Sequence, residues 1–192
     1  MTGAIGRIRG ERLVAILRRV PDVDARVAAL AAAGVGVVEI TLDDPGALAA
    51  IERARGRGDV TVIAGTVRRA DQVDEAVKAG AEGVVSPGFV PAVVARAAEL
   101  GVPAVPGALT PTEVETAWTA GAALVKLFPG SLGGPAYVRE LLAPLADVPL
   151  LVTGGIDATN ARAFLDAGAV AVGAGTALDD PDEARRLVAA VG

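Results

Sequence analysis

Two ionisable residues lie within apolar segments of the chain, where a charge is costly unless it is paired or put to use. Lys126 interrupts residues 123–128, and Glu39 interrupts residues 37–41. The chain has 16 arginines and only two lysines, so a lysine at this position is informative. Arginine and lysine can both carry a buried positive charge, but only lysine can lose its proton and attack a carbonyl carbon. Lys126 is therefore a candidate nucleophile and Glu39 a candidate proton carrier, and the alternative is a structural ion pair.

Two glycine-rich stretches stand near the end of the chain. Residues 153–156 read Thr-Gly-Gly-Ile, and residues 173–177 read Gly-Ala-Gly-Thr-Ala. Glycine lets the backbone come close to a ligand, and successive backbone N–H groups can then surround an anion. These stretches are candidates for a phosphate site, and the alternative is a pair of tight turns.

Other polar residues stand where apolar segments end. Arg18, Thr66 and Ser86 each close such a segment. Arginine suits a carboxylate because its guanidinium can make a two-pronged contact. The alternative for Arg18 is a solvated surface residue, since Arg19 follows it directly. We expect Pro106 and Gly107 to shape the mouth of a site more than to take part in chemistry.

The residue types that are missing restrict the chemistry. The chain has no cysteine and no histidine, which removes a disulfide scaffold, a thiol nucleophile and the commonest zinc ligands. A net charge of −5 and an aromatic content of 3% argue against a nucleic-acid surface. Residues 1–9 lack the apolar core of a signal peptide, and no apolar run is long enough to span a bilayer. A cytoplasmic protein with small-molecule partners is the expectation.

Helices rich in small residues repeatedly end at a glycine, and an apolar segment follows at once. Glycine is favoured there because the residue after a helix often needs a left-handed backbone. Such junctions lie at Gly34, Gly80, Gly101, Gly121 and Gly168. Their spacings are close to 21 residues or to twice that, so residues 55–58 and 143–148 are expected to hold two further junctions.

The apolar segments between these helices are unbroken, which is typical of strands buried on both faces of a parallel sheet. The expected strands are residues 13–17, 37–41, 60–64, 83–86, 103–106, 123–128, 150–153 and 170–173. Thr110, followed by a proline and by Glu113, is expected to begin a helix, as are Asp157 or Thr159 and, before the last helix, Asp180.

Eight strands alternating with eight helices predict an α/β fold, a single-domain (β/α)8 TIM barrel that spans residues 1–192. The rival is an open doubly wound sheet, which the even period and the lack of a dinucleotide-type glycine loop disfavour. In a barrel the site lies at the carboxyl ends of the strands. The glycine stretches then follow strands seven and eight, where phosphate sites are frequent, and alternation places Glu39 on the face that Val37 and Thr41 share.

With these features together, the chain resembles the family of 2-keto-3-deoxy-6-phosphogluconate (KDPG) aldolases, which includes 4-hydroxy-2-oxoglutarate (KHG) aldolases. The resemblance spans most of the chain, and its most specific parts are the lysine strand and the Thr-Gly-Gly stretch. The matching segments are residues 38–42, 64–67, 86–88, 106–107, 110–113, 125–130, 153–156 and 172–176.

The resemblance implies a class I aldolase that needs no metal and no cofactor. Lys126 would form an imine with the C2 ketone of the substrate while Glu39 shuttles protons, and the products would be pyruvate and glyceraldehyde 3-phosphate. Arg18 and Thr66 match the pyruvate-carboxylate ligands of the family, and Phe128 would pack near the imine. The residues that match the family's phosphate loops are Gly154, Gly155, Gly175 and Thr176.

The resemblance also bears on substrate and assembly. Relatives that prefer the galactonate isomer tend to carry an apolar residue where this chain has Thr153, so Thr153 favours the gluconate form. Many members have an arginine where this chain has Asp43, followed by Asp44, and two carboxylates near the mouth are expected to weaken the binding of an anionic substrate. Family members are homotrimers, which agrees with an apolar content of 52%.

Two other functions stay open at this level. One is a barrel isomerase or epimerase acting on a sugar phosphate, which would ordinarily need a histidine, a metal or paired carboxylates. The other is a non-catalytic trimeric barrel whose site has decayed, an idea supported only by the missing arginine.

Overall fold

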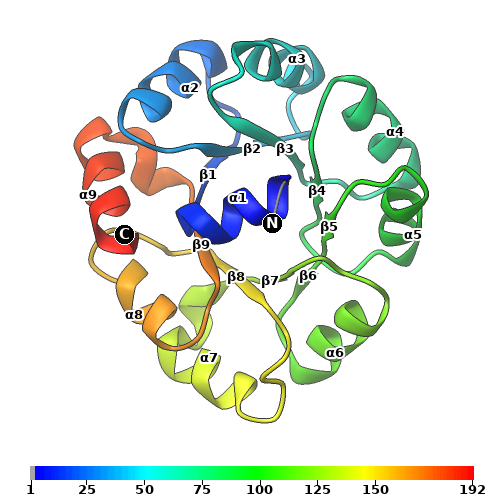
Figure 1. The fold of residues 1–192 in the computed structure, drawn as a ribbon, viewed down its shortest axis with the longest axis vertical. Helices are drawn as coiled ribbons and strands as arrows, with labels where there is room; N and C mark the ends of the chain where they lie inside the picture. The colour runs from blue at the N-terminus through cyan, green and yellow to red at the C-terminus, as the bar shows by residue number, and fades with distance from the viewer. Residues whose placement is uncertain (1–2) are drawn as a thin grey trace.

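The computed structural model describes residues 3–192 as a ring of parallel strands with helices around it (Figure 1). The strands are β1 (Leu13–Leu17), β2 (Val37–Thr41), β3 (Thr61–Gly65), β4 (Val84–Val85), β5 (Ala104–Val105), β6 (Gly107–Ala108), β7 (Val125–Leu127), β8 (Leu150–Thr153) and β9 (Ala171–Ala174). The helices are α1 (Ala4–Glu11), α2 (Val23–Ala32), α3 (Ala47–Arg57), α4 (Ala70–Lys78), α5 (Pro91–Glu99), α6 (Pro111–Thr119), α7 (Gly134–Leu142), α8 (Ala161–Asp166) and α9 (Pro181–Val191). Short 3₁₀ turns occupy Gly130–Leu132 and Thr176–Asp179.

The ring closes through the segment that contains β5 and β6. The paired strands run in the order β5-β4-β3-β2-β1-β9-β8-β7-β6. Ser86 N donates to the Val105 carbonyl at 3.1 Å, and Lys126 N donates to the Pro106 carbonyl at 2.9 Å. One segment thus joins both ends of the sheet, and this barrel excludes the open doubly wound alternative. The fifth strand is in two pieces because Pro106 has no N–H to give to a ladder.

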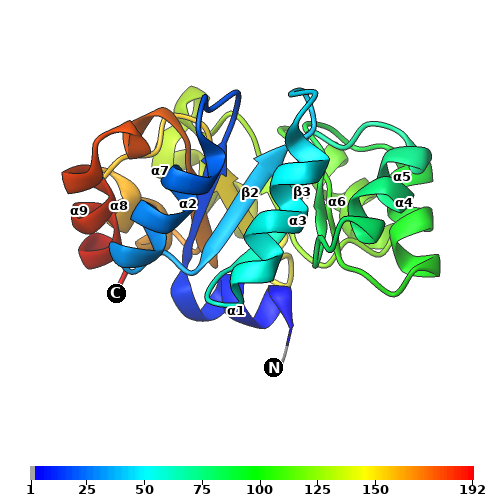
Figure 2. The same cartoon turned by 90° about the horizontal axis from the view of Figure 1, so that it is seen from above.

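A helix that the sequence analysis does not predict closes the amino-terminal end of the barrel. Ala4 and Ile8 of α1 form a buried cluster with residues at the lower part of the barrel interior, including Val37 and Leu151. Figure 2 shows α1 lying across this end, beneath the strands. The helix has few apolar residues of its own, so its pattern gave little signal. In residues 3–192 the lower part of the interior is therefore filled by side chains, and the upper part opens at the carboxyl ends of the strands.

Side chains on the other face of the strands point outward against the helices. Val38 and Ile40 of β2 belong to one large buried core together with Leu30 of α2 and Ile51 of α3. Burying each such side chain is worth about 1.5–3 kcal/mol before the entropy of ordering is subtracted. Because strand residues alternate, this packing fixes Glu39 on the inner face. Within residues 3–192, no helix combines the length and the apolar character that crossing a membrane requires.

The predicted junction glycines all have a left-handed backbone. The φ angles of Gly34, Gly80, Gly101, Gly121 and Gly168 lie between 70° and 110°. Gly58, at one of the two inferred junctions, ends α3 with a φ of 77°. These residues therefore end helices for the reason that the sequence analysis gives.

Two of the three predicted helix starts are confirmed. Thr110 caps α6 with Glu113, and Asp180 accepts a hydrogen bond from Asp182 N at 2.9 Å at the start of α9. The third prediction is wrong, because α8 begins at Ala161 and not directly after Asp157 or Thr159. There the Asp157 carboxylate accepts hydrogen bonds from the N–H and the hydroxyl of Thr159 and stabilises a turn before the helix.

Candidate active site

A cavity of about 340 Å³ opens at the carboxyl ends of the strands. Nine of the ten sequence-predicted site residues line it, and they come from β7, from β8 and from the segments after β1, β3, β7, β8 and β9. These nine are Arg18, Thr66, Lys126, Phe128, Thr153, Gly154, Gly155, Gly175 and Thr176. The tenth, Glu39, is fully buried and lies beside Lys126, below the cavity surface.

Lys126 and Glu39 meet in the barrel interior. Lys126 Nζ lies 3.8 Å from Glu39 Oε1, and the side chains are 7% and 0% exposed. This distance is too long for a hydrogen bond, so the two groups form an ion pair without a direct hydrogen bond. Lys126 Nζ also lies 5.5 Å from the centre of the Phe128 ring. The amine is therefore largely buried in a mostly apolar interior, close to one carboxylate.

The Glu39 carboxylate has little freedom to move. Both its oxygens are buried and make no hydrogen bond within the described part of the chain. On one side it packs against Gly65 of β3, where an added Cβ would lie 2.7 Å from Glu39 Cδ. A buried carboxylate with unused acceptors is costly in a purely structural role. This arrangement favours a working carboxylate over the simple ion pair.

Arg18 is held by two contacts at the mouth of the cavity. One guanidinium nitrogen lies 3.1 Å from Asp43 Oδ2, and another donates to Thr66 Oγ1 at 3.2 Å. Its side chain is 50% exposed, but these contacts make it more ordered than a solvated surface arginine. Thr66 itself has a φ of 58°, a conformation that is unfavourable for a β-branched residue and that occurs preferentially at functional positions.

The Asp43 carboxylate forms ion pairs with two arginines at the mouth of the cavity. Its Oδ2 contacts Arg18 and also Arg19 Nε, the latter at 3.3 Å. Burial by itself would raise the pKa of Asp43, but the Thr41 hydroxyl and the charges of Arg18 and Arg19 outweigh it and lower this pKa. The repulsion that the sequence analysis expects from Asp43 is thus offset locally by two positive charges.

The glycine stretches line the cavity where β8 and β9 end. Gly154 and Gly155 follow β8 with φ angles of 91° and 76°, which side-chain-bearing residues rarely adopt. Gly175 and Thr176 lie where β9 passes into the Thr176–Asp179 turn. Backbone amides brought close to a cavity in this way can contact an anion. The structure therefore brings the two stretches together, as the barrel order predicts.

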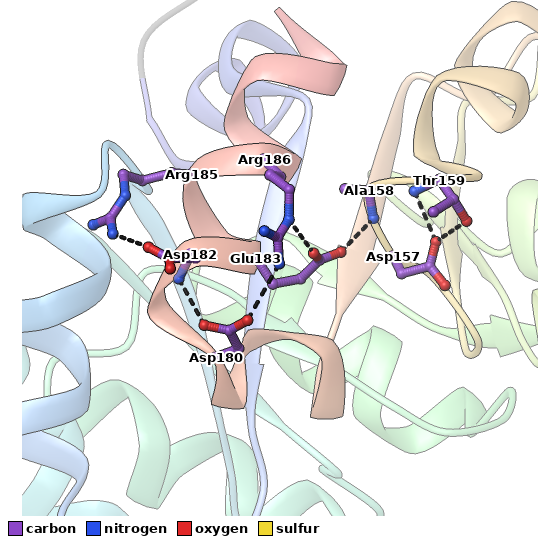
Figure 3. A network of polar contacts seen from close by, with 8 residues as sticks. All are labelled: Asp157, Ala158, Thr159, Asp180, Asp182, Glu183, Arg185 and Arg186. Carbon is purple, nitrogen blue, oxygen red and sulfur yellow. Dashed lines mark hydrogen bonds and ion pairs between the residues drawn. The ribbon is translucent and has the colours of Figure 1, made fainter.

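The β8–α8 loop is also fastened from outside the cavity. Figure 3 shows Glu183 of α9 accepting a hydrogen bond from Ala158 N, while Arg186 holds the other carboxylate oxygen; both distances are 2.8 Å. Asp182 and Arg185 form a second pair on the same turn of this helix. The loop is thus anchored to the last helix of the chain.

Four further residues line the cavity, namely Ile16, Pro87, Ile156 and Gly173. Ile156 and Gly173 belong to the two predicted glycine-rich stretches, whereas Ile16 and Pro87 are not among the predicted site residues. Alternation along β1 could have identified Ile16, which stands two residues before Arg18. Position 173 has no room for a side chain next to Thr153, since an added Cβ would lie 2.7 Å from Thr153 Cγ2. Ser86 is buried but does not line the cavity.

A larger groove of about 450 Å³ lies at the opposite end of the barrel, beside α1 and α2. Its charged groups pair with one another: Arg7 with Glu11 at 2.8 Å, and Arg57 with Asp59 at 2.7 Å. No group of three or more acidic, cysteine or histidine side chains that could hold a metal occurs among residues 3–192. The cavity around Lys126 is therefore the stronger candidate for chemistry.

Known proteins are similar to this chain in sequence and in fold. The family model described as KDPG and KHG aldolase matches residues 5–187. The 2-dehydro-3-deoxy-6-phosphogalactonate aldolase of Escherichia coli is 39% identical over 86% of this chain and 83% of its own. The 2-dehydro-3-deoxy-phosphogluconate aldolase of Treponema pallidum is 40% identical over 79% of this chain and 73% of its own.

The comparison with solved structures points to the same family as the sequence comparisons. A solved structure of the 2-keto-3-deoxy-6-phosphogluconate aldolase of Zymomonas mobilis, determined with 3-phosphoglycerate, superposes with a TM-score of 0.86 at 27% identity and covers 97% of this chain and 94% of that one. A lyase is thereby favoured over an isomerase and over a decayed barrel. The chain belongs to the KDPG and KHG aldolase family, whose members are carbon–carbon lyases of the imine-forming type.

Proposed function

We propose that this protein cleaves KDPG into pyruvate and glyceraldehyde 3-phosphate through an imine on Lys126. The observation that carries the proposal is the position of the Lys126 amine, at the floor of an open cavity and 3.8 Å from the buried Glu39 carboxylate. A primary amine in an apolar chamber is suited to attack a ketone, and an adjacent carboxylate is suited to move the protons that the reaction requires.

The steps follow from this arrangement. Lys126 Nζ adds to C2 of the substrate, and the carbinolamine loses water to give a protonated imine. Removal of the proton from the C4 hydroxyl lets the C3–C4 bond break, and the imine accepts the electron pair as an enamine. Glyceraldehyde 3-phosphate leaves, C3 of the enamine takes up a proton, and water releases pyruvate and the free amine. Glu39 is the proposed carrier of these protons.

The two ends of the substrate would bind at different parts of the cavity lining. We assign the pyruvate carboxylate to Arg18 and Thr66, which line the cavity and contact each other. Phe128 would cover the imine. The phosphate would lie against the backbone of Gly154, Gly155, Gly175 and Thr176, which line the cavity where β8 and β9 end. The phosphorylated ligand of the Zymomonas mobilis enzyme supports a phosphate site in this family.

KDPG is the first choice of substrate, and Thr153 is the reason. Its hydroxyl is buried and makes no hydrogen bond within residues 3–192, and Thr153 lines the same cavity as Lys126. A free hydroxyl there is suited to contact a substrate oxygen. The galactonate epimer is the second candidate, because the Escherichia coli relative acts on it. The shorter KHG is a third, since the family model includes that activity.

Two measurements test the proposal. Pyruvate with borohydride should fix a stable adduct on Lys126, located by mass spectrometry of peptides, whereas Lys126→Met should take up none. A coupled assay for pyruvate release should rank KDPG above its galactonate epimer and above KHG. An unlabelled Lys126 would contradict the imine mechanism, and faster release from the galactonate epimer would move the substrate assignment to that isomer.

We also propose that the protein is a homotrimer. The family resemblance described above implies a trimer, and Leu132, on the segment after β7 and outside the cavity lining, is 69% exposed. Contact with a second copy would bury this large apolar side chain. Light scattering after gel filtration should give about three times the 19.1 kDa of one chain. A monomer mass at micromolar concentration would overturn this assignment.

A further inference from the structure

The loop after β8 is organised by one side chain outside the cavity. Asn160 Nδ2 donates to the Gly155 carbonyl at 2.8 Å, and Asn160 Oδ1 accepts from Asp157 N at 3.1 Å. The carboxamide thus links the first half of the loop to the second half. Ser131 N donates to the Gly154 carbonyl at 3.0 Å, so two successive carbonyls of the loop are held by donors that do not line the cavity.

Holding these carbonyls fixes the direction of two N–H groups. In a trans peptide the C=O and the N–H of the same unit point in opposite directions. The Gly154 carbonyl shares its peptide unit with Gly155 N, and the Gly155 carbonyl shares its unit with Ile156 N. Since both carbonyls point to donors outside the cavity, both N–H groups point away from those donors. Gly155 and Ile156 themselves line the cavity.

These two N–H groups are also free. Neither Gly155 N nor Ile156 N donates a backbone or side-chain hydrogen bond to an acceptor in the part of the chain that the structure describes. Two adjacent, unused N–H groups on one side of a cavity form a site for an anion. The geometry of this site depends on the backbone of Gly154 and Gly155. Because glycine has many accessible backbone conformations, other contacts must hold the loop in one of them.

We infer that Asn160 is a positioning residue which, through the Gly155 carbonyl, holds the Ile156 and Gly155 N–H groups in place for the phosphate of the substrate and so sets the preference for phosphorylated 2-keto acids. The inference rests on the proposed function. Asparagine suits the task because a single side chain supplies both a donor and an acceptor. Aspartate has no donor for the Gly155 carbonyl and would place a negative charge behind the anion site.

Kinetics with matched substrates test the inference. Asn160→Asp and Asn160→Ala are compared with wild type on KDPG and on the same 2-keto-3-deoxy acid without its phosphate. We expect KM for the phosphorylated substrate to rise about tenfold, which corresponds to roughly 1.4 kcal/mol of binding. The kcat/KM for the unphosphorylated substrate should stay within about twofold, as should the rate of borohydride trapping with pyruvate. Inhibition by inorganic phosphate should weaken by a similar factor.

A neighbouring variant controls for effects on the helix. Arg162→Ala removes an exposed ion pair with Asp166 in α8, two residues beyond Asn160 and away from the cavity. This variant should have wild-type KM and kcat/KM for both substrates. Equal losses on both substrates in the Asn160 variants would mean a general structural role and would overturn the inference. Unchanged inhibition by phosphate would overturn it as well.

A measurement on the wild type keeps the test decisive if both variants fail to fold. In ¹⁵N-labelled protein, titration with inorganic phosphate should shift the amide signals of Gly155 and Ile156 more than those of α8. Unmoved signals contradict the inference. Failure of the proposed function would look different: wild type would then not be labelled by pyruvate and borohydride, or would not prefer the phosphorylated substrate. If wild type is labelled and prefers the phosphorylated substrate, and the Asn160 variants have wild-type kinetics with both substrates, the role of Asn160 is refuted and the proposed function is not.

Discussion

Lys126 Nζ stands 3.8 Å from Glu39 Oε1 across the barrel interior, a distance at which the charges interact but no hydrogen bond forms. β2 and β7 are not neighbours in the ring, so these side chains meet only because the barrel is closed. Closure, and not a local motif, creates the pair.

Replacing Lys126 by arginine should separate charge from chemistry. Arginine keeps a positive charge near Glu39 but cannot form an imine. We expect kcat for pyruvate release to fall by about four orders of magnitude or more, with the thermal unfolding midpoint within a few degrees of wild type. The measurement is the coupled assay together with a melting curve. Retained activity in Lys126→Arg would refute the imine mechanism and would suit a function that does not depend on this amine.

Glu39→Gln should slow proton transfer without removing the nucleophile. The amide has nearly the shape of the carboxylate, so Gly65 should still accommodate it. We expect kcat to fall about 10²–10⁴-fold while pyruvate can still be trapped on Lys126 on a longer time scale. Single-turnover trapping followed by mass spectrometry separates the two effects. A Glu39→Gln variant with wild-type kcat would leave Glu39 only its ion-pair role.

Gly65→Ala should damage the site by displacing Glu39. The new Cβ would lie 2.6 Å from Glu39 Cγ, so the carboxylate must shift away from Lys126. A displacement of about 1 Å can cost 10²-fold in rate, and we expect a loss of roughly that size in kcat. Gly56→Ala is the matched control, because its Cβ meets no atom within 4 Å in α3. The control should keep full activity and gain up to about 1 kcal/mol in stability.

Asp43 should stabilise the fold in a pH-dependent way. Its pKa in the folded state lies below the ordinary value, so protons bind the unfolded chain more readily. The stabilisation is complete above the unfolded pKa of about 4 and is lost as the pH falls through the lower folded pKa. Wild type should therefore exceed Asp43→Asn in Tm at pH 6, and the difference should shrink by pH 3. A Tm difference that is constant over this range would show that the charge is not the cause.

Thr110→Ala should affect stability alone. Thr110 caps α6, and Glu113 Oε2 accepts hydrogen bonds from Leu109 N and Thr110 N, each at 2.8 Å. Loss of the cap should lower the free energy of unfolding by about 1 kcal/mol, measured by urea denaturation. The kcat should not change, because Thr110 does not line the cavity. A fall in kcat would show that this segment contributes to the site.

The residues that sequence reasoning located are those whose type conflicts with their surroundings. Lys126 and Glu39 are charges in apolar strands, and strand alternation is enough to turn both inward. The glycines at 154 and 155 were found because a barrel gives meaning to their position after a particular strand. The same period predicted the strands Leu13–Leu17, Val37–Thr41 and Leu150–Thr153 with the bounds that the structure has.

What the sequence did not reveal depends on contacts that only the folded chain makes. Asp43 looked like a repulsive charge because only the folded chain places Arg18 and Arg19 around it. Asn160 had no distinguishing pattern in the sequence, because its contact with the Gly155 carbonyl, five residues away, depends on the shape of the loop. The helix α1 is stabilised by the barrel end it covers, and its own eight residues contain too few apolar positions to announce it.

The position of α1 has a consequence for the order of events in the proposed reaction. With Ala4 and Ile8 packed into the amino-terminal end, both products must leave through the opening at the carboxyl ends of the strands. In the proposed reaction pyruvate stays bonded to Lys126 after the C3–C4 bond breaks, whereas glyceraldehyde 3-phosphate is not bonded to the protein. Glyceraldehyde 3-phosphate is therefore released before pyruvate, and pyruvate binds first when the bond is made in the reverse direction.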